Sequence, residues 1–296
     1  MSSSTKYATA KVSDIAKIIE TVSAATLKRT VETIAVPRHF RLEGEQNEWT
    51  AEWIANELRG FGYNVKFQGP YRNVIATLPE TAHGDLTLIG AHYDSVPGTP
   101  GADDNASAVA AMLECARVIA GLDEPPPVCF AAFNCEEDGL IGSTDFVKNY
   151  LPAASFKIKA AHILEMVGYC SHAEGSQNVP PGLPIKVPTV GNFIGILANR
   201  DSNSLIDHAL ERSATYLPGF PVLGLKTYLG VEKYLSVLGR SDHLPFWNAG
   251  IPAVMWTDTA DFRNPNYHRK TDTPDTLDYD FMRSTTQLVL SCILIG

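Results

Sequence analysis

In the stretch Pro126–Ser143, "PPVCFAAFNCEEDGLIGS", a run of apolar residues is followed by acidic ones. Its first part, Val128 to Phe133, holds six apolar residues without alternation. Such a run is typical of a strand that is covered on both faces. Two adjacent glutamates, Glu136 and Glu137, follow it closely. Because carboxylates at the end of a buried strand are unfavourable unless positive charge lies beside them, the stretch predicts a functional site.

Apolar runs and helical patterns alternate on both sides of this strand. Further strands are expected at 64–67, 73–78, 86–91, 160–164, 193–198 and 252–256, and helices at 11–36, 48–59, 105–120, 204–216 and 277–294. This alternation predicts an α/β protein, three-layer α/β/α with a mostly parallel mixed sheet. We expect one domain over 1–296, with an N-terminal helical segment (1–36) and a loop-rich elaboration (171–234) near the substrate site.

Composition limits the classes of partner. The 296 residues carry a net charge of −9 and show no basic cluster, which argues against nucleic acid. No stretch approaches the roughly 18 apolar residues of a membrane span, and the N-terminus shows no signal peptide. We therefore expect no membrane partner and a cytoplasmic protein as the sequence stands, or a secreted or periplasmic one if a signal was removed. A monomer or a small homo-oligomer is expected.

Residues able to bind a metal follow several of the expected strands. His92 and Asp94, in "HYDS", are two apart on a strand and so point the same way, which places a carboxylate beside an imidazole. Asp104 follows in "GADDNASA", Glu165 follows another strand, and His268 lies in "NPNYHRKTDT". Taken singly, helix capping explains Asp104 and a core histidine explains His92. Their convergence at the carboxyl ends of the strands instead favours a metal site.

The donor types indicate which metal and how many ions. Oxygen and nitrogen ligands without thiolates suit two Zn²⁺ ions, with Mn²⁺ or Co²⁺ as substitutes. Two metals need one bridging carboxylate and about two further ligands each. Three ligand carboxylates, Asp104, Glu137 and Glu165, also offset most of the charge of two zinc ions. Glu136 is then left over as a carboxylate able to act as a general base.

At this point several motifs match a known family. "HYDS", "GADDNAS", "NCEEDGLIGS", "ILEMVGY" and "NPNYHRKTDTPDTLDY" resemble segments of the co-catalytic zinc aminopeptidases, which include bacterial leucyl-type enzymes and are related to glutaminyl cyclases. The motifs occur in the family's order, from about Pro37 to the C-terminal helix. The resemblance implies a zinc-dependent exopeptidase fold, and a single metallopeptidase domain.

The resemblance also implies a ligand set. The implied metal ligands are His92, Asp104, Glu137, Glu165 and His268. His92 and Glu165 would share one zinc, and Glu137 and His268 the other. Asp104 would bridge both, and the Asp104–Asn105 peptide is expected to be cis, as in relatives.

Three catalytic roles follow from the same resemblance. Glu136 would be the general base, Asp94 would orient His92, and Tyr267 would steady the tetrahedral oxyanion. For "RSDHLPF", a helix cap by Ser241 or Asp242 and a role in supporting the site are equally expected. The side-chain pocket is expected to draw on Phe193, Ile194, Tyr228 and Tyr234.

The expected function is hydrolysis of N-terminal residues from peptides with a free N-terminus, through a metal-bridging water and a Glu base. Two alternatives stay open. One is a glutaminyl cyclase-like or other amidohydrolase reaction on the same scaffold. The other is a non-catalytic binding module, against which the full set of competent ligands argues.

Overall fold

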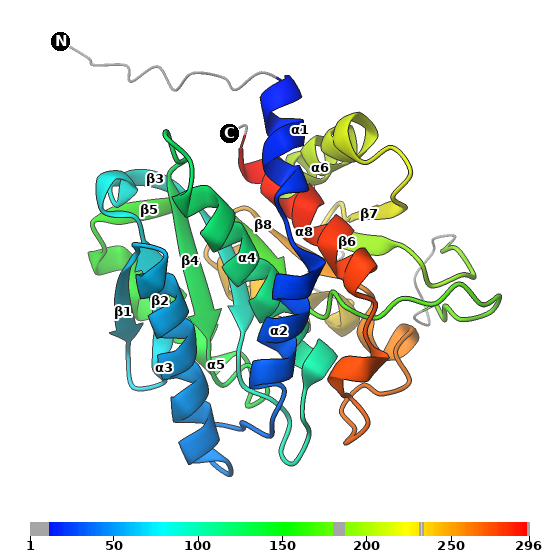
Figure 1. Ribbon diagram of the computed structural model, residues 1–296, viewed down its shortest axis with the longest axis horizontal. Helices are drawn as coiled ribbons and strands as arrows, with labels where there is room; N and C mark the ends of the chain where they lie inside the picture. The colour runs from blue at the N-terminus through cyan, green and yellow to red at the C-terminus, as the bar shows by residue number, and fades with distance from the viewer. Residues whose placement is uncertain (1–11, 180–186, 231, 233, 295–296) are drawn as a thin grey trace.

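The computed structural model describes residues 12–179, 187–230, 232 and 234–294. At its centre lies an eight-stranded sheet in the order β1-β2-β4-β3-β5-β8-β6-β7 (Figure 1). The strands are β1 (Asn64–Gln68), β2 (Asn73–Thr77), β3 (Gly84–His92), β4 (Val128–Phe133), β5 (Phe156–Leu164), β6 (Ile194–Ala198), β7 (Val222–Lys226) and β8 (Ala253–Thr257).

Parallel pairing dominates the middle of the sheet. Strand β3 pairs in parallel with β4 and with β5, and β5 pairs in parallel with β8. Antiparallel pairs join β1 to β2, β2 to β4, and β6 to β8, while β7 runs parallel to β6 at the far edge. The expected mixed, mostly parallel sheet is confirmed.

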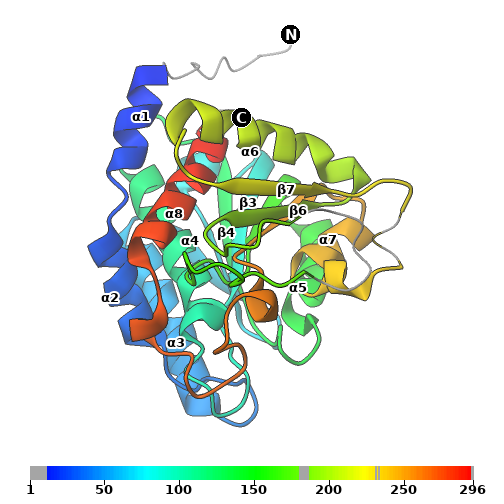
Figure 2. The ribbon, with the colours of Figure 1, turned by 90° about the vertical axis from the view of Figure 1, so that its right-hand side faces the viewer.

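Helices cover both faces of the sheet (Figure 2). They are α1 (Val12–Glu20), α2 (Ala24–Ile34), α3 (Gly44–Gly60), α4 (Ala108–Ala120), α5 (Ile141–Asp145), α6 (Asn203–Tyr216), α7 (His243–Asn248) and α8 (Tyr279–Ile293). One face packs against α1 to α4, α6 and α8, and the other against α7 and residues that follow α5, such as Phe146 and Val147. The three-layer α/β/α architecture is therefore confirmed.

The continuous apolar run of β4 follows from this double cover. Phe130 packs into the core under α2, α3 and α4, whereas Cys129 and Phe133 pack into the opposite core with Phe146 and Phe246. Successive side chains of a strand point to opposite faces, so a strand buried on both faces has no polar positions. All six residues of β4 are buried.

The N-terminal helical pattern forms two helices where the sequence predicted one. The helical conformation is interrupted between α1 and α2, at residues 21–23. Ser23 caps α2 through its Oγ, which accepts from the amide of Thr26, and its own N–H donates to buried Glu114 at 2.7 Å. Local capping and a tertiary partner thus interrupt a continuous apolar periodicity. Lys11, where the predicted helix began, lies outside the described residues.

Residues 171–234 contribute two strands and a helix to one end of the sheet. Strand β6 and helix α6 were expected, whereas β7 was not. All five residues of β7 are only half-buried, because it is an edge strand. Residues 180–186 of the loop-rich stretch lie outside the described residues.

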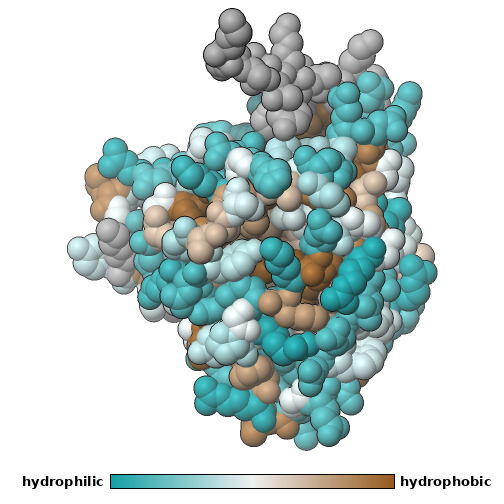
Figure 3. All heavy atoms as spheres, turned by 90° about the vertical axis from the view of Figure 1, so that its left-hand side faces the viewer, coloured by the Kyte–Doolittle hydropathy of each residue, from teal (hydrophilic) through white to brown (hydrophobic). Residues whose placement is uncertain are grey.

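The exterior agrees with this layering. Figure 3 views the molecule from the side on which β1 lies in Figure 1, and hydrophilic residues predominate there with smaller apolar areas between them. Within the part of the chain that the structure describes, no helix combines the length and apolar character needed to cross a membrane.

Candidate active site

The carboxyl ends of three neighbouring strands bring the acidic and histidine side chains together. His92 is the last residue of β3 and pairs with Phe133, the last residue of β4. Glu136 and Glu137 follow β4, and Glu165 directly follows β5. Because β3, β4 and β5 are mutually parallel, these residues share one edge of the sheet.

The backbone beside these side chains is strained. Cys135, Met166 and His268 have φ values of 57°, 49° and 57°, which non-glycine residues rarely adopt. Cys135 directly precedes Glu136, and Met166 directly follows Glu165. Such strain persists where surrounding contacts fix the chain, and it clusters at functional sites.

Two three-residue groups share the carboxylate of Asp104. In the first group, Nε2 of His92 lies 3.3 Å from Oδ1 of Asp104 and 3.4 Å from Oε2 of Glu165. In the second, Nε2 of His268 lies 3.2 Å from Oδ2 of Asp104 and 3.5 Å from Oε2 of Glu137. Each oxygen of Asp104 therefore faces a different histidine. All five expected ligands are brought together.

These distances fit cations between the side chains. Two ligand atoms bound at 2.0–2.1 Å around a tetrahedral zinc lie about 3.3 Å apart, which is close to the four separations. Among the described residues, buried Nε2 of His92 and Oε1 of Glu137 have no hydrogen-bond partner. Buried polar atoms without partners are unfavourable unless something binds them. The donor set and its spacing thus fit two metal ions of the zinc type.

The loop that carries Asp104 is held by other polar residues. The Asp104–Asn105 peptide is cis, as expected. Backbone amides of Asp103 and Asp104 donate to Asp272 at 2.9 and 3.1 Å. The side-chain amide of Asn105 donates to the carbonyl of Leu164 at 3.0 Å, which ties the loop to the end of β5.

Asp94 is positioned to support two elements of the site. It is fully buried, and its Oδ1 lies 3.4 Å from Nδ1 of His92. Its two oxygens accept from the backbone amides of Glu136 and Glu137, each at 3.2 Å. One carboxylate thus fixes the His92 ring and the turn after β4.

Glu136 stands apart from the two ligand groups. Its Oε2 lies 4.0 Å from Nε2 of His92, farther than any of the ligand contacts. Its side chain is 10% exposed, so it lines the site without being fully enclosed. This placement separates Glu136 from the neighbouring Glu137, which contacts His268.

Burial and mutual repulsion govern the charges of the side chains in this site. Burial raises the pKa of Glu136 and of Glu137 well above the usual range, and neighbouring carboxylates add to the shift. Burial alone would lower the pKa of His92, but Glu165, Glu136 and Asp104 outweigh it and raise that pKa well above its usual value. The site therefore stabilises positive charge at its centre.

Tyr267 lies beside the second group. Its ring stacks on His268 with centroids 3.7 Å apart, and its hydroxyl oxygen accepts from Nη2 of Arg240 at 3.0 Å. Burial, with the nearby charge of Asp104, raises the pKa of the Tyr267 hydroxyl. The hydroxyl stays protonated and can donate a hydrogen bond.

Ser241, in the segment "RSDHLPF", contacts one of the expected ligands directly. Ser241 donates from Oγ to Oε2 of Glu165 at 2.6 Å, and neither Ser241 nor Asp242 caps α7 through its side chain. Of the two roles expected for this segment, Ser241 takes the supporting one.

Buried Arg38 is a supporting residue that the sequence analysis did not predict. Its guanidinium donates to the carbonyls of Val36, Tyr93, Pro100 and Gly101, which links the loops after β3 to the N-terminal segment. A single arginine after Pro37 carries no motif that would have revealed this.

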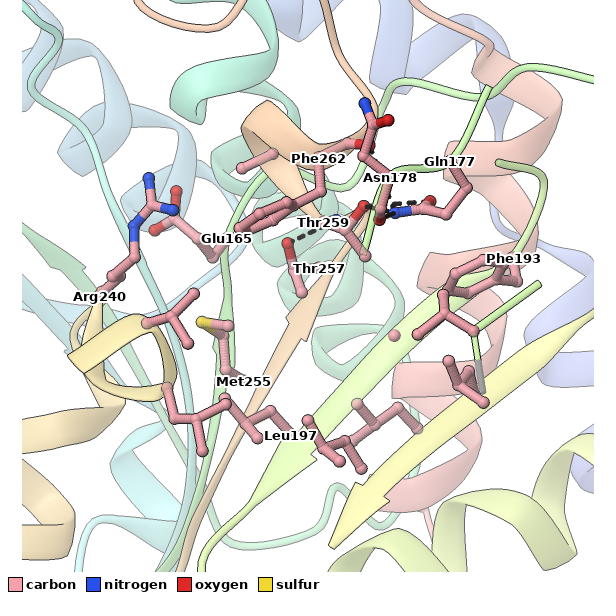
Figure 4. A pocket seen from close by; sticks show the side chains of 18 of the residues that line it. Glu165, Gln177, Asn178, Phe193, Leu197, Arg240, Met255, Thr257, Thr259 and Phe262 are labelled. Carbon is pink, nitrogen blue, oxygen red and sulfur yellow. Dashed lines mark hydrogen bonds between the residues drawn. The ribbon is translucent and has the colours of Figure 1, made fainter. Parts of the chain in front are cut away.

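A pocket opens beside the ligand groups (Figure 4). Glu165 and Arg240 lie at one end, Phe193 lies at the other, and Leu197 and Met255 line the apolar wall between them. Phe193 is therefore a pocket residue, as expected. The other three candidates are not among its lining residues: Ile194 is buried in the core, and Tyr228 and Tyr234 are 57% and 85% exposed.

Comparison with known proteins identifies the family of the chain. The profile of Peptidase family M28 matches residues 73–187 and 224–293. The chain belongs to Peptidase family M28. This confirms the family resemblance and the enzyme class expected from the motifs, a hydrolase of the metallo-exopeptidase type.

Individual M28 relatives cover the chain to different extents. The chain is 34% identical over 262 residues to the uncharacterized protein YfbL of Escherichia coli K12, covering 82% of this chain and 79% of that protein. It is 30% identical over 214 residues to aminopeptidase YwaD of Bacillus subtilis, covering 71% of this chain but 41% of that protein.

Solved structures of similar fold include two further proteins. LapB from Legionella pneumophila matches with a TM-score of 0.76 and 23% identity, covering 97% of this chain and 75% of LapB. BSAP, a zinc aminopeptidase from Bacillus subtilis, matches with a TM-score of 0.55 and 27% identity, covering 75% of this chain and 49% of BSAP. The first supports the fold, and the second is described as a zinc enzyme.

Proposed function

We propose that this M28 protein is a zinc-dependent aminopeptidase that removes apolar N-terminal residues from peptides. One observation carries the proposal: two three-ligand groups share Asp104, and Glu136 lies beside them without joining either group. Oε2 of Glu136 is 4.0 Å from Nε2 of His92. His92, Asp104 and Glu165 would hold one Zn²⁺, and His268, Asp104 and Glu137 the other. Zinc ions there would supply Lewis acidity toward the scissile carbonyl and the attacking water.

Glu136 would move the proton. It would accept one from the attacking water and deliver it to the nitrogen of the leaving amine. Asp94 would keep Glu136 in reach, because it binds that residue's backbone amide. The protonated hydroxyl of Tyr267 would donate to the oxyanion that develops on the former carbonyl oxygen.

The surroundings favour a peptide with a free amino terminus. Glu136 and Glu165 form an acidic rim that would attract the α-ammonium group, and an N-acetyl cap removes that charge. The adjoining pocket offers Leu197, Met255 and Phe193 to the first side chain. Because burial of apolar surface stabilises binding by about 25 cal/mol per Å², leucine, methionine and phenylalanine are the favoured residues.

The test is release of chromophore from a panel of aminoacyl anilides, each with a free or an acetylated amino group. We expect hydrolysis of the free Leu, Met and Phe substrates, loss of it after chelation, and its return with zinc. Glu136→Gln should keep its bound zinc but lose about 10²- to 10⁴-fold in kcat. The exposed Glu174→Gln serves as the matched control with unchanged turnover.

Other outcomes redirect the assignment. If none of the anilides is hydrolysed although two zinc ions are bound per chain, aminopeptidase activity is rejected. A peptide with N-terminal glutamine would then test cyclase chemistry. A silent panel without bound metal would favour a binding module. Full turnover by Glu136→Gln would reject Glu136 as the base.

A further inference from the structure

A second cluster of metal-binding side chains lies outside the site described above. It consists of Cys170, His172 and Asp278, whose ligand atoms all lie within 4.8 Å of one another. Cys170 and His172 belong to the loop after β5, and Asp278 is the N-cap residue of α8. None of the three belongs to the two groups around Asp104.

The separations suit a small thiophilic cation. Sγ of Cys170 lies 3.8 Å from Nε2 of His172. A sulfur bound at about 2.3 Å and a nitrogen bound at about 2.0 Å to one tetrahedral zinc lie roughly 3.5 Å apart, so a shift of a few tenths of an ångström closes the site. One thiolate, one imidazole and one carboxylate form a mixed donor set that is suited to zinc.

Backbone hydrogen bonds hold the chain on both sides of Cys170 and at Asp278. On one side of Cys170, the amide of Tyr169 donates to Asp258 at 2.9 Å. On the other side, the amide of Ser171 donates to the carbonyl of Gly191 at 2.8 Å. The amide of Asp278 donates to the carbonyl of Gly168 at 2.9 Å. Ligands on such held segments lose little conformational entropy when a metal binds.

Asp278 keeps an oxygen for a metal. Its Oδ1 accepts from the amides of Asp280 and Phe281, which caps α8. Among the described residues, Oδ2 receives no hydrogen bond. A cation at Oδ2 would leave the cap intact.

The cluster is poorly suited to act as a thiolate nucleophile. Burial, with the adjacent charge of Asp278, raises the pKa of the Cys170 thiol to about 11. Reactive cysteines have lowered pKa values, whereas a metal can displace the proton from a thiol of raised pKa when it binds.

We infer that Cys170, His172 and Asp278 form a third metal site, which binds Zn²⁺ and fastens the loop after β5 to the N-terminus of α8. With three protein ligands, the fourth position is open to water, so the ion exchanges with solution. The inference is independent of the aminopeptidase assignment, because it uses none of the residues of that site.

Cobalt provides a test that reports thiolate ligation directly. The protein is titrated with Co²⁺, and the sulfur-to-cobalt charge-transfer band is followed. The Asp104 groups contain no sulfur, and the other four cysteines are buried. We expect a band whose amplitude corresponds to one thiolate-bound cobalt per chain, in addition to cobalt bound around Asp104, and that is absent in Cys170→Ala.

Two ligand variants and one control complete the design. His172→Ala and Asp278→Asn should each weaken the cobalt affinity read from this band at least about tenfold. Asparagine keeps an oxygen for the α8 cap. His83→Ala, which also removes an exposed histidine from a loop, should leave the titration unchanged.

Three results would overturn the inference. They are no charge-transfer band at saturating cobalt, a band that persists in Cys170→Ala, and a band whose affinity is unchanged in both His172→Ala and Asp278→Asn. Peptide hydrolysis by Cys170→Ala plays no part in the test, so failure of this site and failure of the aminopeptidase assignment are distinguished.

Discussion

Replacing Asp94 by asparagine tests how the site is supported. Asparagine has the same shape, but one of its two terminal groups donates instead of accepting. In the wild type both oxygens accept backbone amides, from Glu136 and Glu137, at 3.2 Å. One of these amides would therefore face an NH₂ group and lose its partner in a fully buried place.

The magnitude follows from these contacts. Loss of one hydrogen bond to a charged group, with a buried N–H left without a partner, costs about 1.5–3 kcal/mol. We expect the free energy of unfolding to fall by about that amount, 1.5–3 kcal/mol. Urea denaturation of the metal-free protein at constant m-value measures it.

A second variant in the same cluster is needed because the substitution also changes a buried acidic group. Glu137→Gln likewise converts a buried carboxyl group to an amide but keeps both backbone contacts of Asp94, so the difference between the two variants isolates the lost amide contact. Exposed Asp207→Asn on α6 should change stability by less than about 0.5 kcal/mol. If Asp94→Asn were no more than about 1 kcal/mol less stable than Glu137→Gln, the supporting role of Asp94 would be refuted.

Three further predictions concern metal affinity, pH and packing. Ser241→Ala removes the 2.6 Å hydrogen bond to Glu165, so zinc affinity measured by chelator competition should fall about 10-fold or more. Equal affinity would contradict the contact's role. Burial lowers the pKa of His162 to about 3. Below pH 6.5 this residue therefore binds more protons in the unfolded chain than in the folded protein. Its contribution to the free energy of unfolding is lost as the pH falls from about 6.5 toward 3. His162→Gln, urea-unfolded between pH 4 and 7, should flatten this decline by up to about 1.4 kcal/mol per pH unit, and an unchanged slope would exclude the effect. In Gly142→Ala the new Cβ would overlap the backbone oxygen of Asn134, so thermal unfolding should show a loss of about 2 kcal/mol or more, whereas a wild-type midpoint would show that the turn yields.

Local patterns were sufficient for much of the architecture. The unbroken apolar run of β4 specified a strand buried on both faces, because period and polarity are local properties of the chain. Residues at or shortly after the carboxyl ends of β3, β4 and β5 could be grouped in advance, since parallel strands end at a common edge. For that reason, His92, Glu137 and Glu165 lie together at this edge of the sheet.

Other features depend on partners that are distant in sequence. The break between α1 and α2 is tied to buried Glu114, and β7 is a short, half-buried edge strand with Gly224 at its centre. Arg38 and Ser241 each make their supporting contacts with segments more than 50 residues away. No local pattern records which distant group will satisfy a buried polar side chain.

The sequence by itself therefore determined the class of fold and the types of residue at the strand ends. Tertiary structure decided which of those side chains face a common point, such as the two oxygens of Asp104 toward His92 and His268. It also placed Cys170 beside Asp278, more than 100 residues later in the chain. Periodicity is local, whereas the meeting of ligands depends on how strands and loops pack in three dimensions.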